Sequence, residues 1–122
     1  MKVLGVEDNP VNMKLLMLVL KKYGHEAIPA INGTEGVEKA VRYHPDLILM
    51  DIMLPDITGL EATKQIREIK NMADVKIIAI TSYAMSGDRE KIIQAGCNGY
   101  FEKPIDPLKI MEDIQKMIGE NP

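Results

Sequence analysis

The sequence predicts a doubly wound α/β domain, in which a parallel sheet is covered by helices on both faces. Two runs, Leu47–Met50 and, apart from Lys76, Val75–Ile80, are continuously apolar, as is typical of strands that are buried on both sides. Strand patterns also alternate with helical patterns along the chain, and this order produces right-handed crossovers between parallel strands. The expected architecture is therefore five βα units arranged as a three-layer sandwich.

Each strand pattern is followed by a stretch with the apolar spacing of an amphipathic helix. The expected strands are Lys2–Val6, Glu26–Ala30, Leu47–Met50, Val75–Ile80 and Gly99–Phe101. The expected helices cover approximately 10–23, 33–43, 59–70, 87–95 and 107–118. Pro10 and Pro107 suit the first turns of the first and last helices, and Asp8 or Asn9 suits the N-cap of the first helix. Gly24 and Gly96 suit the ends of the first and fourth helices.

Length and composition exclude several classes of protein. A chain of 122 residues forms one domain, and its 46% hydrophobic and 27% charged residues are ordinary for a globular protein. A net charge of -3 argues against non-specific nucleic-acid binding, and no apolar run is long enough to span a membrane. The single cysteine, Cys97, is expected to be a buried structural thiol in a reducing compartment. We therefore expect one cytoplasmic domain, residues 1–122, without a nucleic-acid or membrane partner.

The informative polar residues all follow the ends of expected strands. Glu7 and Asp8 follow the first strand, Asp51 the third, Thr81 the fourth and Lys103 the fifth. Because the carboxyl ends of parallel strands share one edge of the sheet, these side chains are expected to converge there.

This combination of side chains favours phosphoryl chemistry with a bound metal ion. Three carboxylates repel one another unless a cation lies among them, and oxygen ligands suit Mg²⁺. His25 and His44 are isolated, so the sequence offers no zinc cluster. Lysine and a hydroxyl group suit phosphate oxygens, and a carboxylate can itself accept a phosphoryl group. The sequence contains no glycine-rich phosphate loop, so it gives no indication of a bound nucleotide.

These motifs together identify a known family. They are Glu7-Asp8-Asn9, Asp51 with Pro55 and Gly59, Thr81, and Lys103-Pro104. Because these motifs follow one another in the family's order and at the same strand ends, the sequence resembles the receiver domains of two-component response regulators over essentially its whole length. The resemblance implies the flavodoxin-like fold with strand order 2-1-3-4-5.

The resemblance also implies a role for each site residue. Asp51 would be the phosphoacceptor, and Glu7, Asp8, Asp51 and the backbone carbonyl of Met53 would bind Mg²⁺ directly or through water. Further implied roles are those of switch hydroxyl for Thr81, phosphate partner for Lys103, switch aromatic for Tyr100 and a cis peptide bond before Pro104.

The implied function is that of a phosphorylation-controlled signalling module. A histidine kinase or histidine phosphotransfer protein would donate the phosphoryl group, and a downstream protein would bind the face formed by the fourth helix, fifth strand and fifth helix. Arg89, Lys91 and Lys109 are candidates on that face, the alternative for each being an ordinary solvated charge. The motifs resemble receivers of hybrid histidine kinases and stand-alone single-domain cell-cycle regulators. Because the chain ends after the fifth helix, we expect the stand-alone type, as a monomer or a phosphorylation-dependent dimer.

The first helix carries more apolar residues than one core face requires. At 100° per residue, the core arc is expected to hold Asn12, Leu15, Leu16, Val19, Leu20 and Tyr23. Outside this arc lie Val11, Met13, Met17 and Leu18, among Lys14, Lys21 and Lys22. We predict that this outer surface docks a helical phosphodonor, the alternative being apolar residues scattered on the surface.

Two features depart from the family pattern or modify it. Gly5 stands in the middle of the first strand, where the family usually has an aliphatic residue, so it leaves volume unfilled or allows close backbone approach. Met53 and Tyr83 lie two positions after Asp51 and Thr81, where family members control access of the hydrolytic water. Neither side chain orients water well, so slow self-dephosphorylation is expected.

Three other functions fit parts of the pattern. A relay intermediate would pass the phosphoryl group onward to another histidine. A phosphatase of the haloacid dehalogenase type also uses an aspartate nucleophile and Mg²⁺, but it needs a second aspartate where this chain has Met53. A flavodoxin-like cofactor carrier needs a hydroxyl-rich phosphate loop after the first strand, where Glu7 and Asp8 would repel phosphate.

Overall fold

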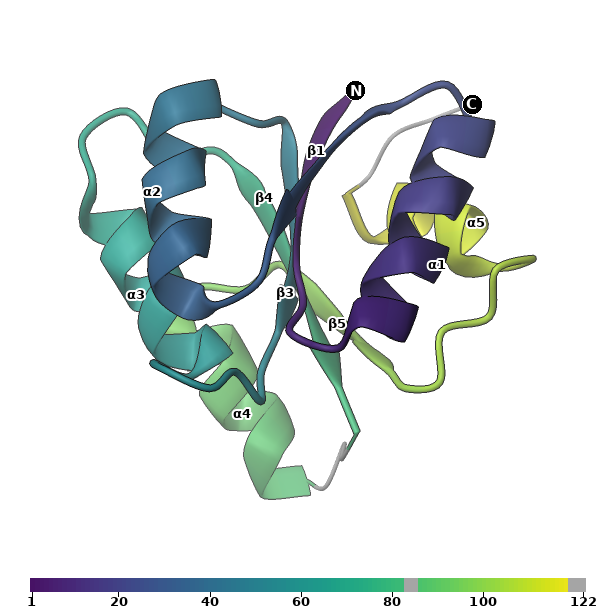
Figure 1. Cartoon of the computed structure of the whole chain (residues 1–122). Helices are drawn as coiled ribbons and strands as arrows, with labels where there is room; N and C mark the ends of the chain where they lie inside the picture. Colours follow the sequence, from purple (N-terminus) through teal and green to yellow (C-terminus); the bar gives the residue numbers. More distant parts are fainter. Residues whose placement is uncertain (83–85, 119–122) are drawn as a thin grey trace.

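The computed structural model describes residues 1–82 and 86–118, and within them five parallel strands form one sheet of order β2-β1-β3-β4-β5 (Figure 1). The strands are β1 (Lys2–Val6), β2 (Glu26–Ala30), β3 (Leu47–Asp51), β4 (Lys76–Thr81) and β5 (Gly99–Glu102). The helices are α1 (Pro10–Lys22), α2 (Gly33–Tyr43), α3 (Gly59–Glu68), α4 (Ser86–Ala95) and α5 (Ile110–Ile118). The expected fold class and strand order are confirmed.

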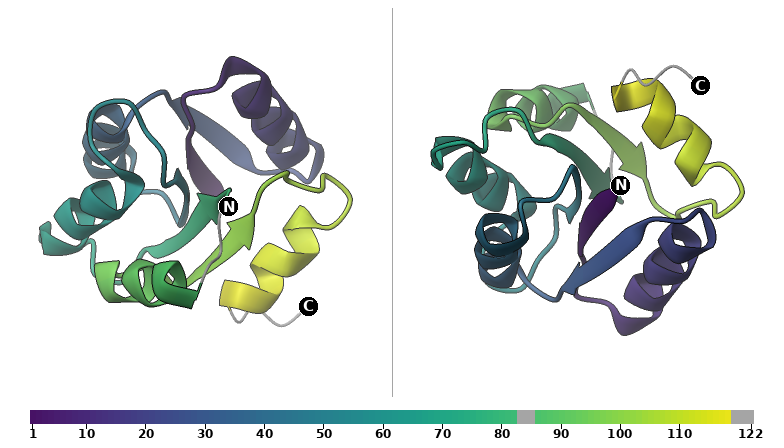
Figure 2. Two further views of the ribbon diagram at one scale, coloured as in Figure 1. Left: turned by 90° about the horizontal axis from the view of Figure 1, so that it is seen from below. Right: turned by 90° about the horizontal axis from the view of Figure 1, so that it is seen from above.

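The helices divide between the two faces of the sheet, as the views along the sheet show (Figure 2). One core cluster joins α2, α3 and α4 to the sheet, and Ile48 and Met50 of β3 belong to it. The other cluster joins α1 and α5 to the opposite face, which receives Leu47 and Leu49. All five residues of β3 are buried, because helices cover both sides of this central strand.

The first helix begins at Pro10, and Asn9 is its N-cap. The Asn9 side chain accepts hydrogen bonds from the amides of Val11 and Asn12 at 2.9 and 3.0 Å. Of the two caps that the sequence allowed, Asn9 therefore satisfies the helix terminus. Asp8 is left with an exposed carboxylate beside the sheet edge.

The last helix begins later than expected. Pro107 does not open it, because residues 107–109 form a turn and α5 starts at Ile110. The Asp106 carboxylate accepts a hydrogen bond from the Leu108 amide at 2.9 Å, and the Asp106 carbonyl accepts one from the Ile110 amide at 2.9 Å. These are the bonds of an N-cap at Asp106 and of a first turn, but the regular helix begins only at Ile110, so the predicted start at Pro107 lies three residues too early.

Gly5 allows α1 to approach β1 closely. A Cβ atom at this position would lie 2.9 Å from both Leu16 Cδ2 and Met17 Cε. The side chains of Leu16 and Met17 therefore occupy the volume that an aliphatic residue would fill. Met17 packs against the core and does not belong to the outer surface of α1, whereas Tyr23, expected in the core arc, is 50% exposed.

Cys97 is buried, and its environment is that of a structural thiol. Burial raises the pKa of this thiol, while the Thr63 hydroxyl at 3.8 Å acts in the opposite direction. A thiol that stays protonated is a poor nucleophile. Across the described residues, no helix has the length and apolar character needed to cross a membrane.

Gly59 holds the start of α3 against the end of β3. A Cβ atom at position 59 would collide with the Asp51 carbonyl oxygen and would lie 2.8 Å from Ile52 Cα. The Gly59 amide also donates to the Ile52 carbonyl at 2.9 Å. Glycine is needed here because any side chain at position 59 would push the start of α3 away from the backbone at the end of β3.

We predict that Gly59→Ala lowers the free energy of unfolding by about 3 kcal/mol, because the new methyl group overpacks rigid backbone. Urea denaturation measures the change. Lys64→Ala, on the exposed side of the same helix, is the control and should shift stability by no more than about 0.5 kcal/mol. Equal stability of Gly59→Ala and the wild type would contradict this account of the loop.

Candidate functional site

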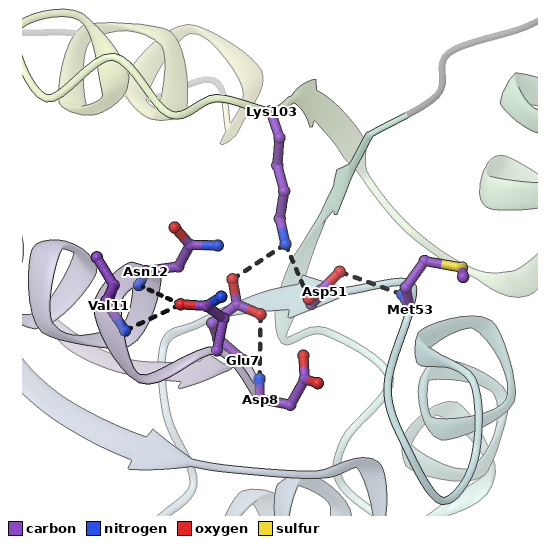
Figure 3. A network of polar contacts seen from close by, with 8 residues as sticks. Glu7, Asp8, Val11, Asn12, Asp51, Met53 and Lys103 are labelled. Carbon is purple, nitrogen blue, oxygen red and sulfur yellow. Dashed lines mark hydrogen bonds and ion pairs between the residues drawn. The ribbon is translucent and has the colours of Figure 1, made fainter.

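The side chains predicted to converge do so at the carboxyl ends of β1, β3 and β5 (Figure 3). Glu7 directly follows β1, Asp51 is the last residue of β3, and Lys103 directly follows β5. Glu7 and Asp51 are only 3% and 2% exposed. The central strands thus place two carboxylates in a largely buried position, where an ionic partner is required.

Lys103 provides that partner. Its Nζ lies 3.0 Å from Glu7 Oε1 and 3.0 Å from Asp51 Oδ2, so one ammonium group bridges both carboxylates. Figure 3 shows the side chain reaching down from the end of β5 between them. The Lys103 amide donates to the Thr81 carbonyl at 2.7 Å, which continues the pairing of β5 with β4 and sets the height of the lysine above the sheet.

Backbone amides orient the remaining carboxylate oxygens. The Met53 amide donates to Asp51 Oδ1 at 3.1 Å, and the Asp8 amide donates to Glu7 Oε2 at 3.0 Å. Both oxygens of Asp51 therefore have a donor, one from the lysine and one from the β3–α3 loop. This arrangement fixes the rotation of the Asp51 carboxylate.

The charges of the site are not balanced. Burial raises the pKa of Glu7, and the hydrogen bond and charge of Asp51 raise it further against the opposing effect of Lys103. Burial alone would lower the pKa of Lys103, but Asp51 and Glu7 outweigh it and raise the pKa. Lys103 thus pairs with two carboxylates while Asp8 adds a third to the cluster, so the excess charge of the site is negative.

The acidic cluster has the composition and spacing of a cation site. Glu7, Asp8 and Asp51 each offer a carboxylate oxygen, and these atoms all lie within 4.8 Å of one another. Two of the three are buried and the third is exposed, so the cluster is open on one side. An all-oxygen donor set with negative excess and access to water fits a hard divalent ion such as Mg²⁺.

The predicted switch residues lie on the neighbouring strands β4 and β5. Thr81 ends β4, is 5% exposed, and lines a hollow of about 250 Å³ with Met53 and Asp88. Tyr100 is half-buried on β5 and packs against the core formed with α2, α3 and α4. The peptide bond between Lys103 and Pro104 is cis, as predicted. Tyr83 lies outside the described residues.

The predicted docking residues of α1 differ in exposure. Val11 and Leu18 are 76% and 57% exposed, and Lys14 is also exposed, whereas Met13 is half-buried. Beside them a hollow of about 300 Å³ separates α1 from the β5–α5 loop. Its lining residues are Asn12, Leu15, Lys103, Pro104 and Ile105.

Leu108, at 82% exposed, adds a further apolar side chain on the β5–α5 loop. Sequence reasoning missed it because it expected this residue inside a helix.

A second residue that sequence reasoning missed is Asp56, which fastens the β3–α3 loop to α2. Its Oδ1 accepts from the Gly33 amide at 2.8 Å and its Oδ2 accepts from the Thr34 amide at 2.9 Å. The hydrogen bonds with Thr34, led by that of its side chain, hold the pKa of Asp56 well below its usual range. An acidic residue between Pro55 and Gly59 was the available sequence signal, but its partner lies 22 residues away.

Comparison with known proteins identifies the family. The model of the response regulator receiver domain matches residues 3–115. The chain belongs to this family. It is 42% identical over 118 residues to the polar-differentiation response regulator DivK of Brucella ovis, covering 97% of this receiver and 96% of the relative.

Solved receiver structures share its fold. The receiver domain of the sensor histidine kinase PA1611 from Pseudomonas aeruginosa has a TM-score of 0.88 and 39% identity, with 98% of each chain covered, and holds a magnesium ion in its active-site cleft. A chain from the Saccharomyces cerevisiae complex between the phosphotransfer protein Ypd1 and the receiver of its response regulator Ssk1 has a TM-score of 0.88 and 32% identity. The match covers 96% of this receiver and 88% of that chain.

The raised pKa of Glu7 predicts that Glu7→Gln stabilises the metal-free receiver at neutral pH. A raised pKa means that the neutral form favours folding; this contribution is complete below the ordinary pKa and is lost as pH rises through the folded pKa. The gain in melting temperature over the wild type, measured in EDTA, should therefore be absent in acid and grow toward neutral pH.

Glu68→Gln, an exposed substitution on α3, serves as the control and should show no such trend. Mg²⁺ at 100 times the Kd of the wild type should stabilise the wild type by about 2.7 kcal/mol. The same concentration should stabilise Glu7→Gln by less, because the variant has lost one carboxylate of the cluster. A metal-free Glu7→Gln variant that melts below the wild type at neutral pH would refute the prediction.

Proposed function

We propose that this receiver is a phosphoacceptor signalling module that takes a phosphoryl group from a phosphohistidine onto Asp51. The observation that carries the proposal is the position of the Asp51 carboxylate, held between the Lys103 ammonium and the acidic cluster of Glu7 and Asp8. A carboxylate oriented by two donors beside cationic charge is prepared to attack a phosphorus centre. The family membership and the phosphotransfer complex of the Ssk1 receiver support the same function.

In the proposed reaction a carboxylate oxygen of Asp51 bonds to phosphorus as the bond from phosphorus to the histidine nitrogen breaks. The other ring nitrogen of the phosphohistidine carries a proton in this step, so the histidine leaves as a neutral imidazole and the phosphoryl charge moves into the site. Lys103 then neutralises phosphate oxygens, and the Met53 amide keeps the carboxylate in line. Mg²⁺ bound by Glu7, Asp8, Asp51 and the Met53 carbonyl would supply further positive charge for the transferring group.

The proposed response to phosphorylation runs through Thr81 and Tyr100. The Thr81 hydroxyl would move toward the phosphoryl group, and the Tyr100 ring would turn inward, which biases the molecule between two populations. Tyr100 lines a groove of about 530 Å³ together with Arg89, Ile93, Phe101, Glu102 and Met117. This groove lies on the face of α4, β5 and α5 that we propose as the binding site for a downstream protein.

We also propose that the phosphodonor docks on α1 and the β5–α5 loop. Val11, Leu18 and Leu108 are exposed, and they belong to α1 and the β5–α5 loop, the two segments that line the hollow beside Lys103. A histidine kinase or phosphotransfer helix with an apolar stripe would cover these side chains and bring its phosphohistidine to Asp51. Lys14 would add a basic contact at the rim, and Met13 would contribute only its exposed part.

The other functions are less well supported. Repeated hydrolysis of small phosphate esters by the haloacid dehalogenase mechanism needs an aspartate two residues after the nucleophile, but that position is Met53, whose side chain is not an acid and is 68% exposed. We therefore propose that the receiver turns over only by slow self-dephosphorylation. A relay role uses the same Asp51 chemistry, and it differs in passing the phosphoryl group to a second histidine without a partner whose affinity depends on phosphorylation.

Acetyl phosphate and Mg²⁺ should add one phosphoryl group to the wild type, as intact-protein mass spectrometry can show. The adduct should need Mg²⁺, be absent from Asp51→Asn, and persist for minutes or longer once the donor is removed. Asp46→Asn, which changes an exposed carboxylate at the opposite edge of the sheet, is the control and should still be phosphorylated. A wild type without adduct would mean that Asp51 is not a phosphoacceptor.

Charge placed on the α1 surface should slow transfer from a cognate phosphohistidine donor but not from acetyl phosphate. We expect Leu18→Glu and Val11→Glu each to reduce the rate of transfer about 10-fold, because a buried apolar contact becomes a desolvated charge. Val41→Glu, at an exposed apolar position on α2, is the matched control. Equal transfer rates in all three variants would rule out docking on α1.

A further inference from the structure

The β3–α3 loop, residues 52–58, carries the backbone of the proposed metal site. At its start, the Ile52 amide donates a hydrogen bond to the Ile80 carbonyl of β4 at 3.1 Å. At its end, the Gly59 amide donates to the Ile52 carbonyl. Between these points Met53 contributes an amide to Asp51 and the carbonyl proposed for Mg²⁺. The position of that carbonyl therefore depends on what restrains the outer part of the loop.

Asp56 supplies this restraint from outside the site. Its two carboxylate oxygens accept the Gly33 and Thr34 amides in the first turn of α2, so the loop is attached to a helix through a bidentate, charge-assisted contact. The carboxylate also lies at the positive end of the α2 dipole, which favours its ionised form. Hydrogen bonds with the Thr34 side chain and with backbone amides, including those of Thr34 and Gly33, lower the pKa of Asp56.

A second contact between the β3–α3 loop and the start of α2 lies beside the Asp56 carboxylate. A Cβ atom at position 33 would overlap the Ile57 side chain and would lie 3.0 Å from the Ile57 carbonyl oxygen. The absence of a side chain on Gly33 thus allows the loop to lie directly on the helix terminus. Asn32 independently caps α2 through the Glu35 amide at 2.8 Å, so Asp56 is not required merely to start the helix.

We propose that Asp56 is a positioning residue for the metal site, because its attachment to α2 holds the loop so that the Met53 carbonyl faces the acidic cluster. The inference rests on the proposed function and deepens it: the amino terminus of α2, which supplies no ligand, sets the affinity for Mg²⁺. Release of the loop would leave Glu7, Asp8 and Asp51 in place but would cost the binding energy of a preorganised backbone ligand.

The test compares Mg²⁺ affinity by calorimetry with amide hydrogen exchange in the metal-free receiver. Asp56→Ala should raise the Kd for Mg²⁺ about 10-fold, the size of effect seen when the support of a metal ligand is removed. The Met53 and Thr34 amides should exchange faster in that variant. Asp56→Asn keeps one acceptor oxygen, so it should lie between Asp56→Ala and the wild type.

Two controls separate positioning from general stability. Asn32→Ala removes the neighbouring cap of α2 while leaving Asp56 in place, and Asp46→Ala removes a carboxylate that accepts the Lys2 amide at 2.8 Å at the opposite edge of the sheet. Both should leave the Kd unchanged even where they lower the melting temperature. An unchanged Kd in Asp56→Ala, or an equal loss in Asn32→Ala, would overturn the inference alone. A wild type that binds no Mg²⁺ would overturn the metal part of the proposed function as well.

Discussion

The ionic contact between Lys103 and the two buried carboxylates Glu7 and Asp51 is the constraint on which the site depends. One ammonium group cannot neutralise both acids and Asp8 as well, so the folded receiver retains an excess of negative charge at the sheet edge. This excess opposes folding, and it also creates affinity for a cation. The same electrostatic imbalance therefore reduces the stability of the metal-free domain and prepares it for its proposed reaction.

Sequence reasoning could predict the sheet and the centre of the site because both follow from local patterns. Continuous apolar runs mark β3 and β4, and each polar residue that follows a strand must lie at the shared carboxyl edge. The convergence of Glu7, Asp51 and Lys103 thus needs only the strand assignments and parallel topology. The family resemblance added the strand order and the cis bond before Pro104, which local patterns do not contain.

The features that sequence reasoning missed depend on contacts between distant segments or on the local hydrogen bonds that set where a helix begins. Nothing near Gly5 indicates that Leu16 and Met17 fill its volume, since periodicity places Met17 outside the core arc. Pro107 is a good first residue for a helix, yet the turn built around Asp106 delays α5 by three residues. Asp56 similarly resembles an ordinary loop acid until the amides of Gly33 and Thr34 are seen beside it.

The contacts of the β3–α3 loop suggest why the site combines rigid and adaptable parts. Asp51 and Glu7 are set by central strands, and the Met53 amide is tied to the Asp51 carboxylate, so the acceptor itself has little freedom. Thr81 and Tyr100, by contrast, belong to the strands nearest the proposed output face, where Tyr100 is only half-buried beside a groove. Because the Asp51 carboxylate is held in place, the response that we propose to a phosphoryl group on Asp51 would come from the neighbouring strands, through Thr81 and Tyr100.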